Sequence, residues 1–121
     1  MLPEYAAEMN LLYDFYGGLL KKKQRDIFRM YYAEDLSLAE IAGDIRMSRQ
    51  GVHDALKKSA AALEEYERTL GLAAKHALAE RTVALAGAAL DRLAEERGRD
   101  SELAGRLRDI RATLDRLTPV I

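Results

Sequence analysis

Apolar residues recur at three- and four-residue spacings along this chain, and that period is typical of amphipathic helices. In residues 5–20 the pattern is aromatic, and it ends near Gly17 and Gly18. A second segment of the same kind contains Ile27, Phe28, Met30, Tyr31 and Tyr32. Because its tyrosines, like Tyr13 and Tyr16, keep helical spacing, we expect core or dimer packing rather than stacking on bases. The periodicity predicts an all-α fold.

Two serines mark the starts of the next helices. Ser37 is followed three residues later by Glu40, a capping box that opens a short helix from Leu38 to Asp44. Ser48 can cap a fourth helix that runs to Gly71. The apolar face of this fourth helix consists of Val52, Leu56, Leu63, Tyr66 and Leu70. Two helices joined by a tight turn, with polar residues on the first turns of the second, form a helix-turn-helix.

The fourth helix carries a polar stripe opposite its apolar face. With Arg49 at zero on a helical wheel, the other polar residues lie between about 40° and 180°, whereas the apolar residues cluster from about 300° to 340°. Arginine and glutamine suit base edges, and lysine suits phosphates. The candidate nucleic-acid contacts on this helix are Ser48, Arg49, Gln50, His53, Lys57 and Lys58. The alternative is an ordinary solvated helix face, which Asp54 beside the stripe favours.

Four basic residues stand at the start of the second helical segment. They are Lys21, Lys22, Lys23 and Arg25. Positive charge at a helix N-terminus opposes the helix dipole, so this placement is unfavourable for stability alone. The cluster is either a clamp on a phosphate backbone or a solvated surface run.

Beyond Leu72 the apolar pattern becomes a heptad. One run extends from His76 to Leu93 and closes at Gly98, and a second extends from Leu103 to Leu117 and stops before Pro119. Each run is too short for a lone stable helix and needs a partner surface. We therefore expect a helix-turn-helix domain at 1–72 and, at 73–121, a helical hairpin or dimerisation helices of a homodimer. The predicted dimer or partner interface is Val83, Leu90, Leu93, Leu103, Leu107, Ile110 and Leu114.

Composition excludes several classes of protein. The chain has no cysteine, which removes disulfides and thiolate metal sites and agrees with a reducing compartment, so we expect a cytoplasmic protein. The first ten residues do not look like an export signal, and no apolar run approaches the ~18 residues of a membrane span. His76 and Glu80 lack a second ligand pair, so no metal or other cofactor is predicted. No catalytic motif accompanies either histidine, and we expect no enzyme.

Three segments carry a resemblance to a known family. They are MNLLYDFYG at 9–17, KQRDIFRMYYAEDLSLAEIA at 23–42 and SRQGV at 48–52. Together they resemble the YlxM-type helix-turn-helix proteins of bacteria, over roughly the first 72 residues. The resemblance implies a sigma factor region 4-like fold and a regulatory or accessory role in the signal recognition particle pathway. The chain departs from the family at Lys21, where a threonine cap is usual, and at Arg46, where a left-handed backbone is required.

Three functions remain open at this point. The chain is a DNA-binding regulator of that pathway, an accessory protein that docks on the signal recognition particle protein or RNA, or a coiled-coil adaptor with a vestigial helix-turn-helix. Residues 1–72 carry 10 Lys and Arg against 12 Asp and Glu. Because so few phosphates would be neutralised, binding to nucleic acid depends on local placement of charge rather than on total charge.

Overall fold

The computed structural model describes residue 2, residues 6–97 and residues 101–118. Its described elements are α1 (Ala6–Tyr16), the 3-10 helix η1 (Gly17–Leu19), α2 (Lys22–Tyr32), α3 (Leu38–Ile45), α4 (Arg49–Leu70), α5 (Leu72–Glu96) and α6 (Ser101–Asp115). The prediction of an all-α fold is confirmed. Two compact units divide the chain, unit 1 at residues 1–73 and unit 2 at residues 74–121.

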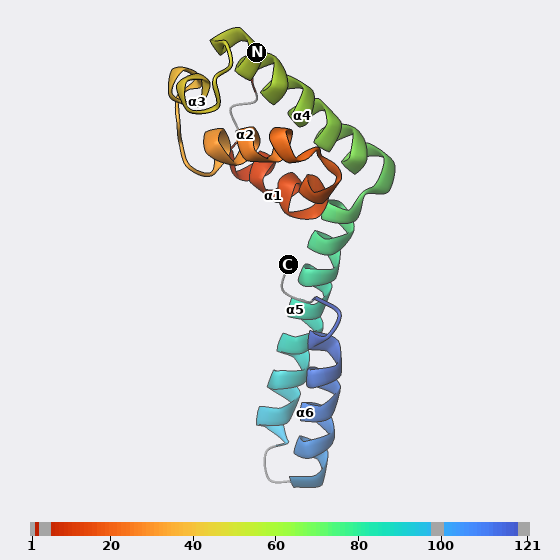
Figure 1. Cartoon of the computed structure of the whole chain (residues 1–121). Coiled ribbons are helices and arrows are strands. Elements are labelled where there is room, and N and C mark those ends of the chain that lie inside the picture. The colour runs from red at the N-terminus through yellow and green to blue at the C-terminus, as the bar shows by residue number, and fades with distance from the viewer. Residues whose placement is uncertain (1, 3–5, 98–100, 119–121) are drawn as a thin grey trace. The chain divides into compact units, whose positions relative to one another are not determined.

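Unit 1 is built around α4, against which α1, α2 and α3 all pack (Figure 1). The largest buried side chains come from every one of these helices, and they include Tyr16, Phe28, Ile41, Leu56 and Leu63. Burial of such side chains contributes about 1.5–3 kcal/mol each. The helix-turn-helix is therefore held by the core of the whole unit and not only by its own two helices.

The aromatic residues of α1 and α2 form this core rather than a surface. Tyr13 stacks on Phe28 at a centroid distance of 5.1 Å, and Phe28 contacts Tyr32 at 4.6 Å. Gly17 permits this stack, because a Cβ there would lie 2.8 Å from the Tyr13 ring. The glycine pair also ends α1 at Tyr16, close to the predicted end at Gly17 and Gly18. Leu19 consequently leaves the apolar face and is 59% exposed.

A hydrogen-bonded network joins the end of α1 to the junction of α4 and α5. The buried Tyr16 hydroxyl donates to Glu67 Oε1 at 2.5 Å and accepts from the Leu72 backbone N–H at 3.0 Å. The same Glu67 oxygen accepts from the Ala73 N–H at 3.0 Å. Between these helices Gly71 takes a left-handed backbone with φ 64°. The first N–H groups of α5, which have no partner inside their own helix, thus receive side-chain acceptors.

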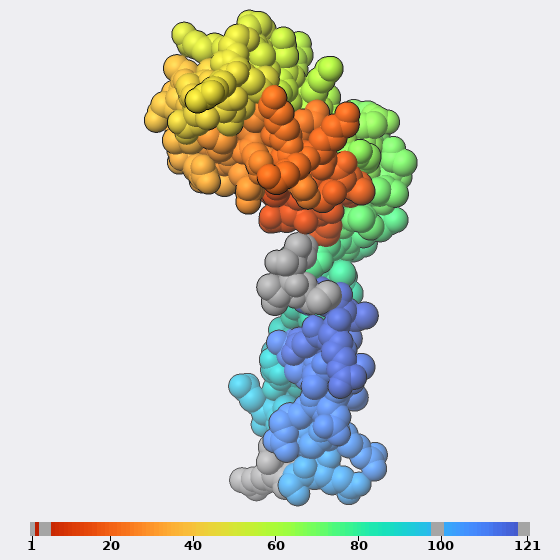
Figure 2. Space-filling model, viewed as in Figure 1, coloured from red at the N-terminus to blue at the C-terminus, as the bar shows by residue number. Residues whose placement is uncertain are grey.

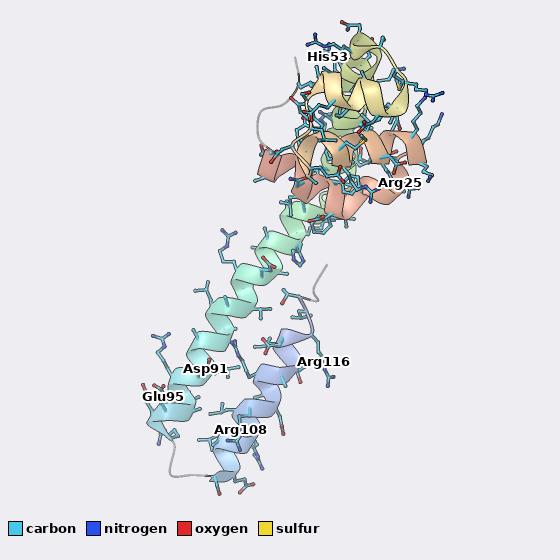
Figure 3. All side chains as sticks on the ribbon, turned by 60° about the vertical axis from the view of Figure 1, so that its left-hand side comes forward. Arg25, His53, Asp91, Glu95, Arg108 and Arg116 are labelled. Carbon is cyan, nitrogen blue, oxygen red and sulfur yellow. The ribbon has the colours of Figure 1, made fainter. Side chains whose placement is uncertain are left out.

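Unit 2 consists of α5 and α6, which run side by side (Figures 1 and 3). Val83 and Leu107 are buried in it. The Arg111 guanidinium of α6 lies against Gly87 of α5, where a Cβ would overlap it, and is 3.9 Å from both Asp91 and Asp115. The predicted second heptad extends too far, since α6 ends at Asp115 and Leu117 is 63% exposed. Gly98 and Pro119, predicted to end the two runs, lie outside the described residues.

Candidate nucleic-acid interface

The first helix of the helix-turn-helix, α3, begins at the predicted capping box. The Glu40 N–H donates to Ser37 Oγ, and the Ser37 N–H donates to Glu40 Oε1, each at 3.1 Å. The hydrogen bond from the Ser37 backbone, followed by one from the Ser37 side chain, holds the pKa of the Glu40 carboxyl below its usual range. The cap predicted from the spacing of Ser37 and Glu40 is therefore confirmed.

The turn between α3 and α4 contains a left-handed residue. Arg46 has φ 56° and ψ 50°, as the turn position in the sequence requires. Its backbone N–H donates to the Ala42 carbonyl, and so does the N–H of Met47, at 3.1 Å. A side chain in this conformation costs roughly 1–2 kcal/mol relative to glycine.

Ser48 then caps α4, as predicted. Its Oγ accepts from the Gly51 N–H at 2.9 Å. A Cβ on Gly51 would approach this oxygen to 3.0 Å, so glycine leaves room for the cap. The serine hydroxyl is consequently occupied with its own helix, and the Ser48 side chain is placed primarily to fix where the exposed part of α4 begins.

The two faces of α4 separate as the helical wheel predicts. Val52, Leu56 and Leu63 are fully buried. In contrast, Arg49, Gln50, Lys57 and Lys58 are exposed. The beginning of α4 forms one continuous surface with α3 at an end of unit 1 (Figure 2). The start of α4 therefore exposes three cationic side chains and the amide of Gln50. An α-helix is of a size that fits into the major groove of DNA.

Asp54 modifies this face more than the sequence suggests. Its Oδ1 accepts a hydrogen bond from Gln50 Nε2 at 2.9 Å and lies 3.7 Å from His53 Nδ1. The His53 side chain is only 27% exposed, and among the described residues its buried Nδ1 has no hydrogen-bond partner. The contact between Gln50 and Asp54 could have been predicted from the sequence, because residues four apart lie on adjacent turns of a helix.

The basic residues at the start of α2 do not join the α4 face. Lys21 occupies the N-cap position and, among the described residues, makes no side-chain cap bond. Lys22 lies 4.0 Å from Asp26, so part of its charge is already paired. Arg25 and His53, both labelled in Figure 3, stand apart on unit 1. Lys21, Lys22, Lys23 and Arg25 are thus a separate feature and not an extension of the recognition surface.

The predicted interface residues of unit 2 differ in exposure. Val83 and Leu107 are 7% and 6% exposed within the single chain, and Leu90, Leu103 and Leu114 are half-buried. Only Leu93 and Ile110 are exposed, at 39% and 49%. Most of these heptad residues are therefore at least half-buried within unit 2 of a single chain, and only a small part of the predicted interface remains exposed for a partner.

Groups that could support other functions are sparse in the described part of the chain. His76 Nε2 and Glu80 Oε1 are 3.0 Å apart on one face of α5. No group of three His, Asp or Glu side chains suited to a metal ion occurs among the described residues. Within the same residues, no helix is long and apolar enough to cross a membrane.

Comparison with known proteins places the chain in a family. A family model described as "Putative helix-turn-helix protein, YlxM / p13 like" matches residues 4–97. A UPF0122 protein of Caldanaerobacter subterraneus subsp. tengcongensis is 60% identical over 68 residues, which are 56% of this chain and 58% of that protein. UPF0122 proteins of Thermoanaerobacter pseudethanolicus and Geobacillus kaustophilus are each 41% identical, over 92% and 88% of this chain and 94% of each relative.

These matches extend beyond the first 72 residues on which the resemblance was recognised. The family model continues through α5, and the two longer alignments cover so much of the chain that each reaches into α6. The C-terminal helices, in which the sequence patterns alone indicated no family feature, are thus part of the family's sequence. The chain belongs to the YlxM / p13-like helix-turn-helix family.

Proposed function

We propose that this chain is a cytoplasmic, non-enzymatic regulatory protein that binds DNA as a homodimer through the start of α4, and that it acts in the signal recognition particle pathway. The observation that carries the proposal is the α3–turn–α4 arrangement, in which Arg49, Gln50 and Lys57 are exposed at the start of α4 while Val52 and Leu56 of the same turns are buried. A recognition helix reads base edges from its N-terminal turns. Arg49 and Gln50 stand there, and Lys57 lies two turns further on.

The near-balanced charge of the chain sets the expected strength of binding. Only a few cations face outward near the start of α4, so few phosphates are contacted and the dependence of affinity on salt is correspondingly shallow. Asp54 adds a negative charge beside Gln50 and lowers the affinity further. We therefore expect binding that is weak at physiological salt and that depends on individual side chains.

A second candidate is an accessory protein of the signal recognition particle that docks on its RNA or its protein component. The near-neutral charge of residues 1–72 favours this function, as do the exposed leucines of unit 2. The family resemblance links both candidates to the same pathway. They differ in the polymer or protein that is bound.

Fluorescence anisotropy at two salt concentrations tests the proposal, with labelled genomic DNA fragments and, in parallel, the signal recognition particle RNA. We expect Lys57→Ala to reduce the dependence of log affinity on log salt by about one unit, because it removes one phosphate contact. Arg49→Ala costs about 1–3 kcal/mol and relaxes base preference if Arg49 contacts a base. Arg68→Ala is the matched control, since it removes the same charge from the far end of α4.

Each outcome has a definite meaning. Salt-sensitive DNA binding that Arg49→Ala and Lys57→Ala weaken, and that Arg68→Ala leaves intact, supports the DNA-binding proposal. Equal weakening by all three variants refutes a specific surface at the start of α4. Binding of the RNA but not of DNA moves the function to the second candidate, and binding of neither leaves the protein component as the partner.

A further inference from the structure

A second apolar stripe runs along α5, away from the side that packs in unit 2. On a helical wheel with Leu78 at zero, its members fall within an arc of about 80°. This α5 stripe consists of Leu78, Thr82, Leu85, Ala89 and Leu93. All five residues are exposed, and the three leucines are 56%, 69% and 39% exposed.

The stripe is distinct from the packed side of α5. Val83 is buried, Gly87 lies under the Arg111 guanidinium, and Leu90 lines a groove together with Leu107 of α6. These three α5 residues lie roughly 100–160° from the centre of the stripe. Apart from the exposed Leu93, the α5 heptad that predicted a partner is thus largely packed within the chain, and the stripe is a further apolar surface.

The single polar member of the stripe does not interrupt its apolar character. Thr82 Oγ1 donates to the Leu78 carbonyl at 2.8 Å, so the hydroxyl is satisfied by its own helix. Its methyl group can then contribute to an apolar contact. Leu78 and Leu93 are separated by fifteen residues, so the stripe is about 22 Å long. An apolar strip of this length on a helix is suited to another helix.

We infer that the stripe is covered by the same stripe of a second copy of this chain, with the two α5 helices antiparallel about a two-fold axis between Leu85 and Ala86. This deepens, and rests on, the homodimer of the proposed function. A two-fold axis at this point places Leu78 opposite the partner's Leu93 and Thr82 opposite the partner's Ala89. Four of the five stripe residues therefore lie opposite stripe residues of the partner, and Leu85 lies beside the axis, opposite the partner's Ala86.

The charges at the ends of the stripe select this orientation. Lys75 precedes it and Glu96 follows it, both exposed and both within the same arc of the wheel. The same axis brings Lys75 opposite the partner's Glu96 at each end. A parallel arrangement would instead oppose lysine to lysine and glutamate to glutamate. Charge complementarity thus favours a second copy in the antiparallel arrangement.

The dimer is tested by sedimentation equilibrium of the full chain without nucleic acid. We expect Leu85→Glu to raise the dimer dissociation constant at least about a hundredfold, because both copies lose a buried leucine. Ala84→Glu is the matched control and leaves the constant unchanged, since the exposed Ala84 faces about 140° away from the centre of the stripe. Circular dichroism checks that both variants keep their helices. A monomeric wild type, or equal loss of dimer in both variants, overturns the inference.

Charge exchange and cross-linking test the antiparallel orientation. Lys75→Glu and Glu96→Lys should each weaken the dimer, and the double variant should restore it. Because the chain has no cysteine, a variant with both Leu78→Cys and Leu93→Cys should form covalent dimers on oxidation, whereas neither single variant should. Cross-linking by Leu78→Cys alone would overturn the orientation, because a parallel pair brings equal positions together.

These results separate the interface from nucleic-acid binding. Arg49→Ala and Lys57→Ala should leave the sedimentation behaviour unchanged. A dimer that fails to bind nucleic acid contradicts only the nucleic-acid binding of the proposed function, whereas a monomer that binds it contradicts the homodimer and the inference about the α5 stripe.

Discussion

Replacing Tyr16 by phenylalanine removes one hydroxyl from the network at the α4–α5 junction and leaves the buried ring in place. The hydroxyl donates to a carboxylate at 2.5 Å and accepts from the Leu72 N–H at 3.0 Å. A hydrogen bond to a charged group contributes about 1.5–3 kcal/mol, and one between neutral groups contributes about 1 kcal/mol. Water can restore part of the lost hydrogen bonding, because Leu72 is 42% exposed and Glu67 still accepts the hydrogen bond from the Ala73 N–H.

We therefore expect Tyr16→Phe to lower the free energy of unfolding of unit 1 by about 2 kcal/mol, which corresponds to roughly 10 °C in melting temperature. Urea denaturation followed by tyrosine fluorescence measures it, because the chain has no tryptophan and all six tyrosines lie in residues 5–66. The urea midpoint should fall while the slope with urea stays constant.

Tyr13→Phe provides the matched control for this measurement. It removes a hydroxyl from the same helix and keeps the ring stack on Phe28. We expect its free energy of unfolding to change by less than about 0.5 kcal/mol, because the substitution removes no hydrogen bond to a buried group. Equal losses in Tyr13→Phe and Tyr16→Phe, or a Tyr16→Phe loss below about 0.5 kcal/mol, would refute the role given to the junction network.

Three further predictions address the site, the pH dependence and the core. Asp54→Asn should strengthen nucleic-acid binding, since it removes a negative charge beside Gln50 while keeping a hydrogen-bond acceptor; unchanged or weaker anisotropy binding contradicts this. Burial raises the pKa of Tyr32 to about 12, with smaller contributions from Tyr31 and Glu64. As pH rises, Tyr32 loses its proton in the unfolded chain before it does so in the folded one. Its contribution to the free energy of unfolding is therefore complete below pH 10 and is lost between pH 10 and about 12, a loss on the order of 2–3 kcal/mol. Urea titrations over that range should show a shallower loss in Tyr32→Phe, and an unchanged pH slope would count against it. Gly17→Ala should destabilise unit 1 by about 1–3 kcal/mol, because its Cβ would meet the Tyr13 ring. Gly18→Ala, where a Cβ meets nothing within 4 Å, should not, and calorimetry that shows equal effects would reject this account.

The local features of the helix-turn-helix were predictable because each depends on residues close in sequence. The capping box needs only Ser37 and Glu40, and the cap of α4 needs only Ser48 and the N–H of a residue three positions later. The buried face of α4 follows from helical spacing, since Val52 and Leu56 lie one turn apart. These predictions rest on geometry that a single helix or turn determines.

The remaining features depend on which surfaces meet in three dimensions. Tyr16 and Glu67 are 51 residues apart, and no periodic pattern connects them. The heptads of α5 indicated an apolar surface, but they did not show that Val83 would be buried within its own chain and that Leu85 would be left outside. His53 was predicted to face outward by its angle on the wheel, yet the packing around α4 partly covers it.

The junction network also bears on how the long α5 helix comes to form. Starting a helix fixes several residues for a single hydrogen bond, and this nucleation step is the unfavourable one, whereas each later residue adds a bond of its own. Tyr16 and Glu67 hold the N–H groups of Leu72 and Ala73, so the folded unit 1 supplies a preformed first turn. The alanine-rich remainder of α5 then needs only to propagate from it. A folded helix-turn-helix domain therefore acts as a template for the helix of unit 2.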